Sequence, residues 1–399
     1  MENIERFIRY AKIDTQSDDK SNTVPSTAKQ KNLSLLLVKE LKELGLNDAY
    51  MDEYGVVYAH LKGHGDKIGF NAHVDTALEV TGTNCNPRII KKYDGKDIQL
   101  NEKYVLSAKE FPSLLKQIGN DLVVTDGNTL LGADDKAGVA IIMSALANLQ
   151  KHPELKHKNI CVSFTPDEEI GLGAAHFDLN KMDADYAFTV DGGEIENIDY
   201  ENFNAYSFKM QIQGVAVHPG EGKNALINAA LLLNEFINEL PKNETPFDAN
   251  EDEGYWHINE IYGTSESITV EMILREFDKQ KMDNRISNIE KIIAKLAQKY
   301  PKCNFTYNFK IQYENMKPYV EKNPRPIEVA TKAFIKNGIK PVNTKIRGGT
   351  DGAAFSKMGL VTPNIGTGSY NHHGRFEYLS IQEFEKMIQI VTDMMLIEE

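Results

Sequence analysis

The stretch NICVSFTPDEEIG, residues 159–171, decides the fold because an apolar run is followed at once by consecutive acids. Residues 160–164 have the length and composition of a buried strand. Asp167, Glu168 and Glu169 then share one crowded edge at the end of that strand. Two like charges about 4 Å apart repel by about 4 kcal/mol at an effective dielectric constant near 20. The three carboxylates therefore call for a binding partner or a function.

The segments on either side alternate between helical and strand patterns. Before the stretch, the apolar positions predict helices at residues 1–16, 27–46 and 134–150 and strands at residues 56–63, 68–74 and 122–127. After it, residues 186–190 form another short apolar strand pattern. Alternation of this kind favours an α/β architecture.

A second block begins near Tyr206 and has a pattern of its own. Strand, helix, strand, helix and strand are predicted at residues 206–217, 224–240, 266–277, 282–300 and 304–313. Such a block can bury a two-layer core by itself. Since 399 residues exceed one ordinary core, we interpret 1–205 and 318–399 as a catalytic domain interrupted by an inserted domain, 206–317.

Composition excludes several classes of partner. The net charge of −13, from 45 basic and 58 acidic residues, argues against nucleic acid and anionic membrane surfaces, which both favour basic patches. No apolar run approaches the roughly 18–20 residues that span a bilayer, and no signal-peptide pattern is present. The 3 cysteines form neither a disulfide framework nor a CxxC site. We therefore expect a cytoplasmic protein.

Potential metal ligands follow predicted strands or open a predicted helix in five separated segments. Strand ends and strand-to-helix loops are where open α/β sheets place ligand sites. Mixed imidazole and carboxylate ligands suit zinc, with cobalt, manganese or iron as alternatives. The candidates are His73 and Asp75 in NAHVDT, Asp134 and Asp135 in GADDKAG, Glu168 and Glu169, Asp191 in TVDGG, and His373 in NHHGRFE.

Each motif alone also has a simpler explanation. An HxD pair is common at exposed strand ends, and an Asp-Asp pair before a helix is commonly a cap. The two glutamates fit a solvated strand end, and the paired histidines fit a surface loop. All of these explanations would have to hold independently, so the joint pattern favours a metal-dependent hydrolase.

Seven motifs resemble, in order and spacing, those of the peptidase T family, tripeptide aminopeptidases among the two-zinc, lid-bearing exopeptidases. The resemblance covers nearly the whole chain, and NCNPRI at residues 84–89 supports it. The motifs are NAHVDT (71–76), TDGNTLLGADDKAG (125–138), SFTPDEEIGLGAAHFD (163–178), YAFTVDGG (186–193), VHPGEGKN (217–224), IRGGTDGAAFS (346–356) and YNHHGRFEY (370–378).

This resemblance implies an α/β catalytic domain, with a mixed sheet flanked by helices, and an inserted α+β lid of the ferredoxin-like kind. It implies two Zn²⁺ ions, with Co²⁺ or Mn²⁺ as substitutes. Asp75 would orient His73, and Glu168 would be the general base that acts with a metal-bridged hydroxide. The metal ligands would be His73 and Asp191 on one ion, Glu169 and His373 on the other, and Asp134 between them.

The lid would contribute to substrate binding. His218 resembles a histidine that reaches the oxyanion in related enzymes, in some cases from the partner subunit, so the resemblance leaves a homodimer open. Arg275 and Arg347 resemble anchors for a peptide carboxylate, which a guanidinium binds with two parallel hydrogen bonds; the alternative for each is an ordinary surface ion pair. Glu221 and Ser369 depart from the family pattern and affect the expected substrate preference.

The resulting hypothesis is an aminopeptidase that removes the N-terminal residue from short peptides, chiefly tripeptides. Two related amide hydrolases share the metal motifs and remain alternatives: an N-acyl amino acid deacylase and a glutamate-releasing carboxypeptidase. A peptidase-like scaffold without activity is a further alternative. It is disfavoured because every expected ligand and the base are present.

Overall fold

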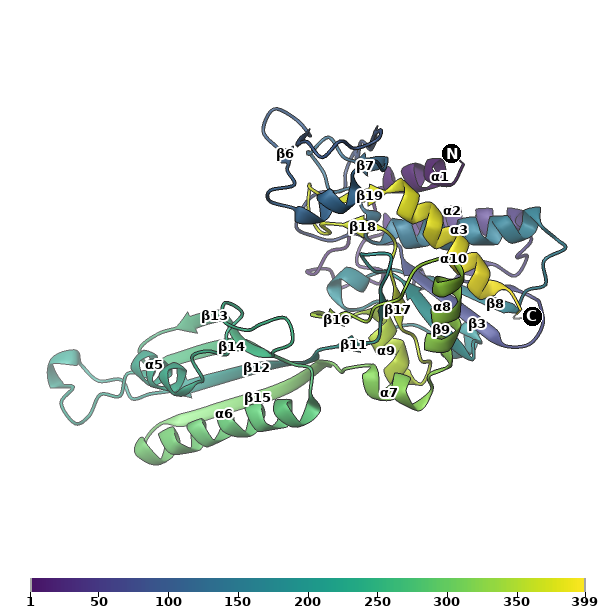
Figure 1. Ribbon diagram of the computed structural model, residues 1–399. Helices are drawn as coiled ribbons and strands as arrows, with labels where there is room; N and C mark the ends of the chain where they lie inside the picture. Colours follow the sequence, from purple (N-terminus) through teal and green to yellow (C-terminus); the bar gives the residue numbers. More distant parts are fainter. Residues whose placement is uncertain (1, 398–399) are drawn as a thin grey trace. The chain divides into compact units, whose positions relative to one another are not determined.

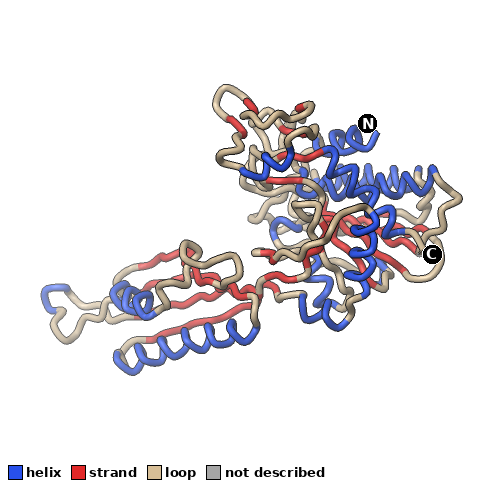
Figure 2. Tube along the Cα trace, in the orientation of Figure 1, coloured by secondary structure: helices blue, strands red, loops and turns tan. Residues whose placement is uncertain are grey.

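The computed structural model describes residues 2–397, which divide into two compact units. Unit 1 comprises the described residues of Met1–Tyr200, Met316–Thr344 and Thr350–Glu399, and unit 2 comprises Glu201–Asn315 and Lys345–Gly349. Figures 1 and 2 show the helices and strands of both units. None of the helices within the described range is long and apolar enough to cross a membrane.

Unit 1 is built on a seven-stranded mixed sheet with the order β1-β2-β8-β3-β9-β17-β10. Its centre is parallel, because β3 pairs in parallel with both β8 and β9, and β17 with β9. The outer pairings of β1, β2 and β10 are antiparallel. The strands are β1 Tyr50–Met51, β2 Val57–Leu61, β3 Lys67–His73, β8 Asn159–Thr165, β9 Tyr186–Val190, β10 Ile198–Asp199 and β17 Asn364–Ile365.

Both faces of this sheet are covered by helices. Ile160 and Val162 of β8 belong to the large core with the long helices, whereas Cys161 between them packs with residues of α4 and α9 on the other face, as strand alternation requires. The helices of unit 1 are α1 Glu2–Ala11, α2 Gln30–Glu43, α3 Ala133–Lys151, α4 Leu179–Met182, α7 Lys317–Lys322, α8 Arg325–Lys336, α9 Asp351–Met358 and α10 Ile381–Met395, with short 3-10 helices at Pro112–Gln117 and Glu168–Ile170.

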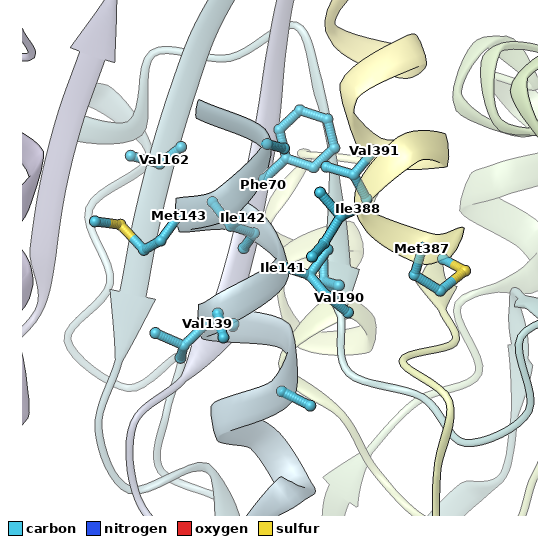
Figure 3. Packing of buried hydrophobic residues seen from close by; sticks show 14 of the residues in the cluster. Phe70, Val139, Ile141, Ile142, Met143, Val162, Val190, Met387, Ile388 and Val391 are labelled. Carbon is cyan, nitrogen blue, oxygen red and sulfur yellow. The ribbon is translucent and has the colours of Figure 1, made fainter. Parts of the chain in front are cut away.

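Helix α3 lies at the centre of the large core. Figure 3 shows its side chains, among them Ile142 and Met143, packed between strand residues such as Phe70 and the α10 residue Ile388. These four side chains have at most 1% of their surface exposed. This packing fixes where the N-terminus of α3 meets the sheet.

A smaller sheet in unit 1 brings two distant loops together. Its order is β18-β19-β7-β4, and Tyr378 of β19 pairs with Val124 of β7. The segments that leave these strands, 125–134 and 371–377, therefore run close to each other. The strands of this smaller sheet are β4 Arg88–Ile90, β7 Leu122–Val124, β18 Ser369–Tyr370 and β19 Tyr378–Ser380. The strands β5 Ile98–Gln99 and β6 Val105–Leu106 form a separate pair.

Unit 2 has the expected ferredoxin-like architecture. Its antiparallel sheet has the order β13-β14-β12-β15, and the chain runs β12-α5-β13-β14-α6-β15. One face of the sheet packs on α5 and α6. The elements are β12 Asn204–Gln213, α5 Ala229–Glu239, β13 Tyr255–Gly263, β14 Ser267–Glu276, α6 Lys279–Lys299 and β15 Asn304–Tyr313, with a short 3-10 helix at Pro219–Glu221.

Strand β13 is absent from the sequence-based assignment, which placed three strands in this block. Its pairing register shifts between Ile258 and Glu260, so a bulge interrupts the alternation of apolar and polar residues. Most of its second half, from Glu260 on, is exposed. An edge strand with this pattern carries little of the period-2 signal from which strands are predicted.

A short return segment also belongs to unit 2. Strand β16, Lys345–Ile346, pairs in parallel with β11, Glu201–Asn202. The residues Lys345–Gly349 are therefore part of unit 2, although the chain on both sides of them lies in unit 1. The sequence did not indicate this excursion, and it places Arg347 on unit 2.

Asp167, which had no assigned role, anchors the end of β8. Its carboxylate accepts hydrogen bonds from the Ser26 amide (2.7 Å), the Ser26 hydroxyl (2.5 Å) and Gln30 Nε2 (2.6 Å). The Asp167 amide in turn donates to Gln30 Oε1 at 3.1 Å. Asp167 is 2% exposed and has a φ of 62°. It ties the turn that carries Glu168 and Glu169 to the start of α2.

Asp167→Asn should destabilise unit 1. The amide would place an N–H group against one of the three donors, and losing a hydrogen bond to a buried charge costs about 1.5–3 kcal/mol. We expect the free energy of unfolding, measured by urea denaturation, to fall by about that amount. Glu43→Gln, at a side chain 62% exposed, is the control. An unchanged unfolding midpoint for Asp167→Asn would contradict the assignment.

Candidate metal centre

The parallel centre of the sheet brings three ligand segments to one edge. His73 is the last residue of β3, Glu168 and Glu169 follow the end of β8, and Asp191 follows the end of β9. Because β8, β3 and β9 are adjacent and parallel, their carboxyl ends lie side by side. This is the edge at which open α/β sheets bind ligands.

The start of α3 adds Asp134 to this edge. The two residues Asp134 and Asp135 have non-helical backbone angles, and the peptide bond between them is cis. A Cβ atom on Gly138 would lie 1.7 Å from the Val190 carbonyl oxygen. Only glycine therefore allows the first turn of α3 to approach β9 this closely.

Asp134 directs its two carboxylate oxygens toward two different histidines. Its Oδ1 lies 3.0 Å from His73 Nε2, and its Oδ2 lies 3.2 Å from His373 Nε2. His373 Nε2 is also 3.0 Å from Glu169 Oε2, and His73 Nε2 is 3.8 Å from Asp191 Oδ1. The arrangement forms two neighbouring half-sites, each with one histidine, that share the Asp134 carboxylate.

The structure thus brings together all five side chains expected to bind metal. His73, Asp134 and Glu169 offer ligand atoms within 4.8 Å of one another, and so do His73, Asp191 and Asp135. Asp135 was one of the candidates from the sequence pattern, but the ligand set implied by the family resemblance does not include it. Its oxygens accept hydrogen bonds from the amides of His73 (3.1 Å) and Gly138 (3.2 Å), so they are occupied by the backbone.

Asp75 lies beside His73, but it does more than orient the ring. Its Oδ1 is 3.3 Å from His73 Nδ1, and that nitrogen has no hydrogen-bond partner within the described residues. The two Asp75 oxygens accept hydrogen bonds from the amides of Glu168 and Glu169, both at 3.1 Å. A single fully buried carboxylate therefore fixes the backbone of the two glutamates and lies next to the His73 ring.

The electrostatics of the cluster favour added positive charge. Burial raises the pKa of Glu168 and of Asp191 well above the usual range. Burial and Asp134 together raise the pKa of Glu169 to about 7. Hydrogen bonds to Asp134 and Glu169 raise the pKa of His373 to about 11. Both kinds of shift reduce net negative charge, because carboxyl groups keep their protons and histidine stays cationic.

These residues fit a pair of divalent ions. The donors are imidazole nitrogens and carboxylate oxygens, which zinc, cobalt and manganese accept. Glu169 Oε1 is buried and has no hydrogen-bond partner within the described residues. A buried oxygen without a partner costs about 1–3 kcal/mol, and a cation would satisfy it.

Glu168 lies at this centre, but it takes no part in the close histidine–carboxylate contacts described above. Its amide is held by Asp75, and its side chain is close enough to His73, Asp191 and Glu169 for their charges to act on it. Its own oxygens form no hydrogen bond among the described residues, so the carboxyl group remains available to a substrate or a water molecule.

Three polar residues near the centre were not anticipated. Asp351, 5% exposed, accepts a hydrogen bond from Thr165 Oγ1 (2.6 Å), and its charge acts on Glu168. His372, expected at the surface, lies 3.5 Å from Asp134 Oδ2 and pairs with Ser369 Oγ (2.8 Å). Glu377 is the third. The available signals were positional, because His372 is next to His373, and Asp351 and Glu377 lie within the quoted motifs IRGGTDGAAFS and YNHHGRFEY.

The three substrate-binding candidates all lie on unit 2. His218 is exposed, and its Nδ1 accepts a hydrogen bond from the Gly220 amide at 3.2 Å. Arg275 is 9% exposed, lies over the Tyr313 ring at 5.4 Å and has no carboxylate partner within residues 2–397. Arg347 is exposed, and it donates to the carbonyls of residues 250 and 251 at 2.8 Å each.

Comparisons with known proteins identify the family of the chain. Residues 124–397 match the profile "Peptidase family M20/M25/M40". A peptidase T from Clostridium perfringens is 46% identical over 393 residues, which cover 98% of this chain and 97% of the relative.

Solved structures share the fold. A tripeptidase from Staphylococcus aureus has a TM-score of 0.78 at 19% identity, over 98% of this chain and 96% of that one. A Bacillus subtilis protein described as a dinuclear metal-binding peptidase of the M20 family has a TM-score of 0.63 at 14% identity, over 98% and 96%. The chain therefore belongs to peptidase family M20/M25/M40, and within it to the peptidase T group.

Proposed function

We propose that the chain is a two-zinc aminopeptidase that releases the N-terminal residue from short peptides, chiefly tripeptides. The observation that carries the proposal is the Asp134 carboxylate, which faces His73 with one oxygen and His373 with the other. A shared carboxylate between two sets of ligands is what a pair of dications about 3.5–4 Å apart needs. The high identity to peptidase T supports the choice of substrate.

The bound ions would be held by His73 and Asp191 on one side, by Glu169 and His373 on the other, and by Asp134 between them. When bound, they supply Lewis-acid polarisation of the scissile carbonyl and of a water molecule. Glu168 takes the proton from that water and passes it to the leaving amine. Asp75 holds Glu168 through its backbone amide, which leaves the carboxylate oxygens open to accept and return a proton.

Unit 2 would select the length of the substrate. Arg275 is a buried guanidinium without a carboxylate partner among the described residues, which is the state expected of an anchor for the C-terminal carboxylate of a peptide. Arg347 is proposed as a second anchor and His218 as a donor to the oxyanion, within one chain or across a homodimer. A cytoplasmic location, expected from the sequence, remains part of the proposal.

Glu168→Gln and Glu169→Ala should fail in different ways. Glu168→Gln should keep both ions and lose on the order of 10²- to 10⁴-fold in kcat, because only proton transfer is removed. Glu169→Ala should lose one ion, because a ligand is removed. The measurements are zinc content per chain and hydrolysis of Leu-Gly-Gly.

Glu43→Gln, on the exposed face of α2, is the matched control and should behave like the wild type in both assays. Equal loss of zinc from Glu168→Gln and Glu169→Ala would contradict the division of roles. Hydrolysis by the chelated, metal-free protein would contradict the metal requirement itself.

The role of Arg275 is tested with Leu-Gly-Gly and its C-terminal amide. The wild type should hydrolyse the free acid with a kcat/KM about 10- to 100-fold above that of the amide, which corresponds to about 1.5–3 kcal/mol for a hydrogen bond to a charged group. In Arg275→Gln, kcat/KM should fall for the free acid and stay unchanged for the amide, so the preference is lost. Arg275→Lys should retain part of the preference.

Two outcomes would contradict this assignment. The first is that Arg275→Gln still prefers the free acid to the same degree as the wild type. The second is that kcat/KM falls equally for the free acid and the amide. Faster turnover of acetyl-leucine than of Leu-Gly-Gly would instead favour a deacylase, so that substrate completes the panel.

A further inference from the structure

Glu377 is a buried acid that the proposed reaction does not use. It is 1% exposed, and no lysine or arginine in the described part of the chain forms an ion pair with it. Its Oε2 accepts hydrogen bonds from the amides of Leu131 (2.8 Å) and Gly132 (2.7 Å), and its Oε1 accepts one from the Asp134 amide (2.9 Å). All three hydrogen bonds of the carboxylate therefore come from the loop that carries Asp134.

Glu377 also belongs to the loop that carries His373. Its own amide donates to the Gly374 carbonyl at 3.3 Å, which closes the turn directly after His373. The strand pair β19–β7 aligns the two loops, and Arg375 donates to the Gly127 carbonyl at 3.4 Å. Glu377 thus connects the loop of the shared ligand to the loop of a ligand that belongs to one ion only.

The loop that carries Asp134 needs a side-chain acceptor because its own backbone does not supply carbonyl acceptors for its amides. Gly132 has a φ of 71°, and Asp134 and Asp135 lie outside the helical range, so the loop amides of Leu131, Gly132 and Asp134 do not point to helical carbonyls. Three amides that converge on one point suit an anionic acceptor with two oxygens. A neutral amide side chain has only one acceptor oxygen.

We infer that Glu377 is a positioning residue that sets the orientation of Asp134 toward both ions. The inference rests on the proposed function, in which Asp134 is the shared ligand. Glu377 would touch neither metal nor substrate and would act through three backbone hydrogen bonds. Groups that orient metal ligands in this way typically contribute 10- to 100-fold to metal affinity.

The test measures Zn²⁺ affinity, by titrating metal-free protein against a competing chelator, in the wild type and in Glu377→Gln. The variant has nearly the same shape, but its N–H₂ group must face at least one of the three backbone donors. We expect Zn²⁺ binding weakened by about 10- to 100-fold, with the far-ultraviolet circular dichroism of the metal-free protein unchanged.

The matched control is Asp52→Asn. The Asp52 side chain is 5% exposed, and its carboxylate accepts hydrogen bonds from the amides of Tyr54 (3.0 Å) and Val56 (3.1 Å) in the turn between β1 and β2. Unlike Glu377, it also pairs with Lys181 Nζ at 3.2 Å. A purely structural acid should affect stability and leave Zn²⁺ affinity unchanged. Equal loss of affinity in Asp52→Asn and Glu377→Gln would overturn the inference.

A second variant and a second measurement guard against a folding defect. Glu377→Asp keeps the charge, but it is one methylene too short to reach all three amides, so it should also weaken Zn²⁺ binding. In metal-free protein, hydrogen exchange at residues 131–134 should be faster in either variant than in the wild type, with the exchange around Asp52 unchanged.

The outcomes separate this inference from the proposed function. Wild-type Zn²⁺ affinity in both Glu377 variants, or unchanged exchange at residues 131–134, would overturn the role of Glu377 and leave the metal centre intact. A wild-type protein that binds no Zn²⁺ would overturn the proposed function instead.

Discussion

The main constraint on the catalytic unit is the repulsion among the carboxylates at one edge of its sheet, which the rest of the structure has to offset. Asp134, Glu168, Glu169 and Asp191 meet around His73, and burial raises the pKa of the last three of these acids. Asp134 is the exception: burial alone would raise its pKa, but the neighbouring histidines hold it well below the usual range. The acid whose pKa is lowered is therefore the one whose two oxygens face the two half-sites.

A set of further acids holds this cluster in place through the backbone. Asp75 accepts the amides of Glu168 and Glu169, and Asp135 accepts those of His73 and Gly138. Asp167 and Glu377 do the same for the turns at Ser26 and at Gly132. A hydrogen bond to a charged group contributes about 1.5–3 kcal/mol, so each loop is fixed independently of the metal. The ligand side chains can then crowd together without displacing the backbone that carries them.

The sequence predicted the α/β architecture, and its short-range patterns named the side chains that the structure brings together at the edge of the sheet. An apolar strand followed by a histidine or an acid is visible within ten residues, and the parallel pairing then brings the strand ends together. Two of the supporting acids, Asp167 and Glu377, were not predictable in this way. The Asp167–Ser26 pair spans 141 positions and the Glu377–Leu131 pair 246, and nothing near either residue indicates its partner. Strand β13 was missed because a bulge disrupts its alternation.

The central claim is that Asp134 is shared between two metal ions. The most direct test is a crystal structure of the zinc-loaded protein with anomalous diffraction at the zinc absorption edge. We expect two zinc peaks, one bound by His73 and Asp191 and the other by Glu169 and His373, with one Asp134 oxygen on each. A single peak, or two peaks of which only one contacts Asp134, would contradict the claim.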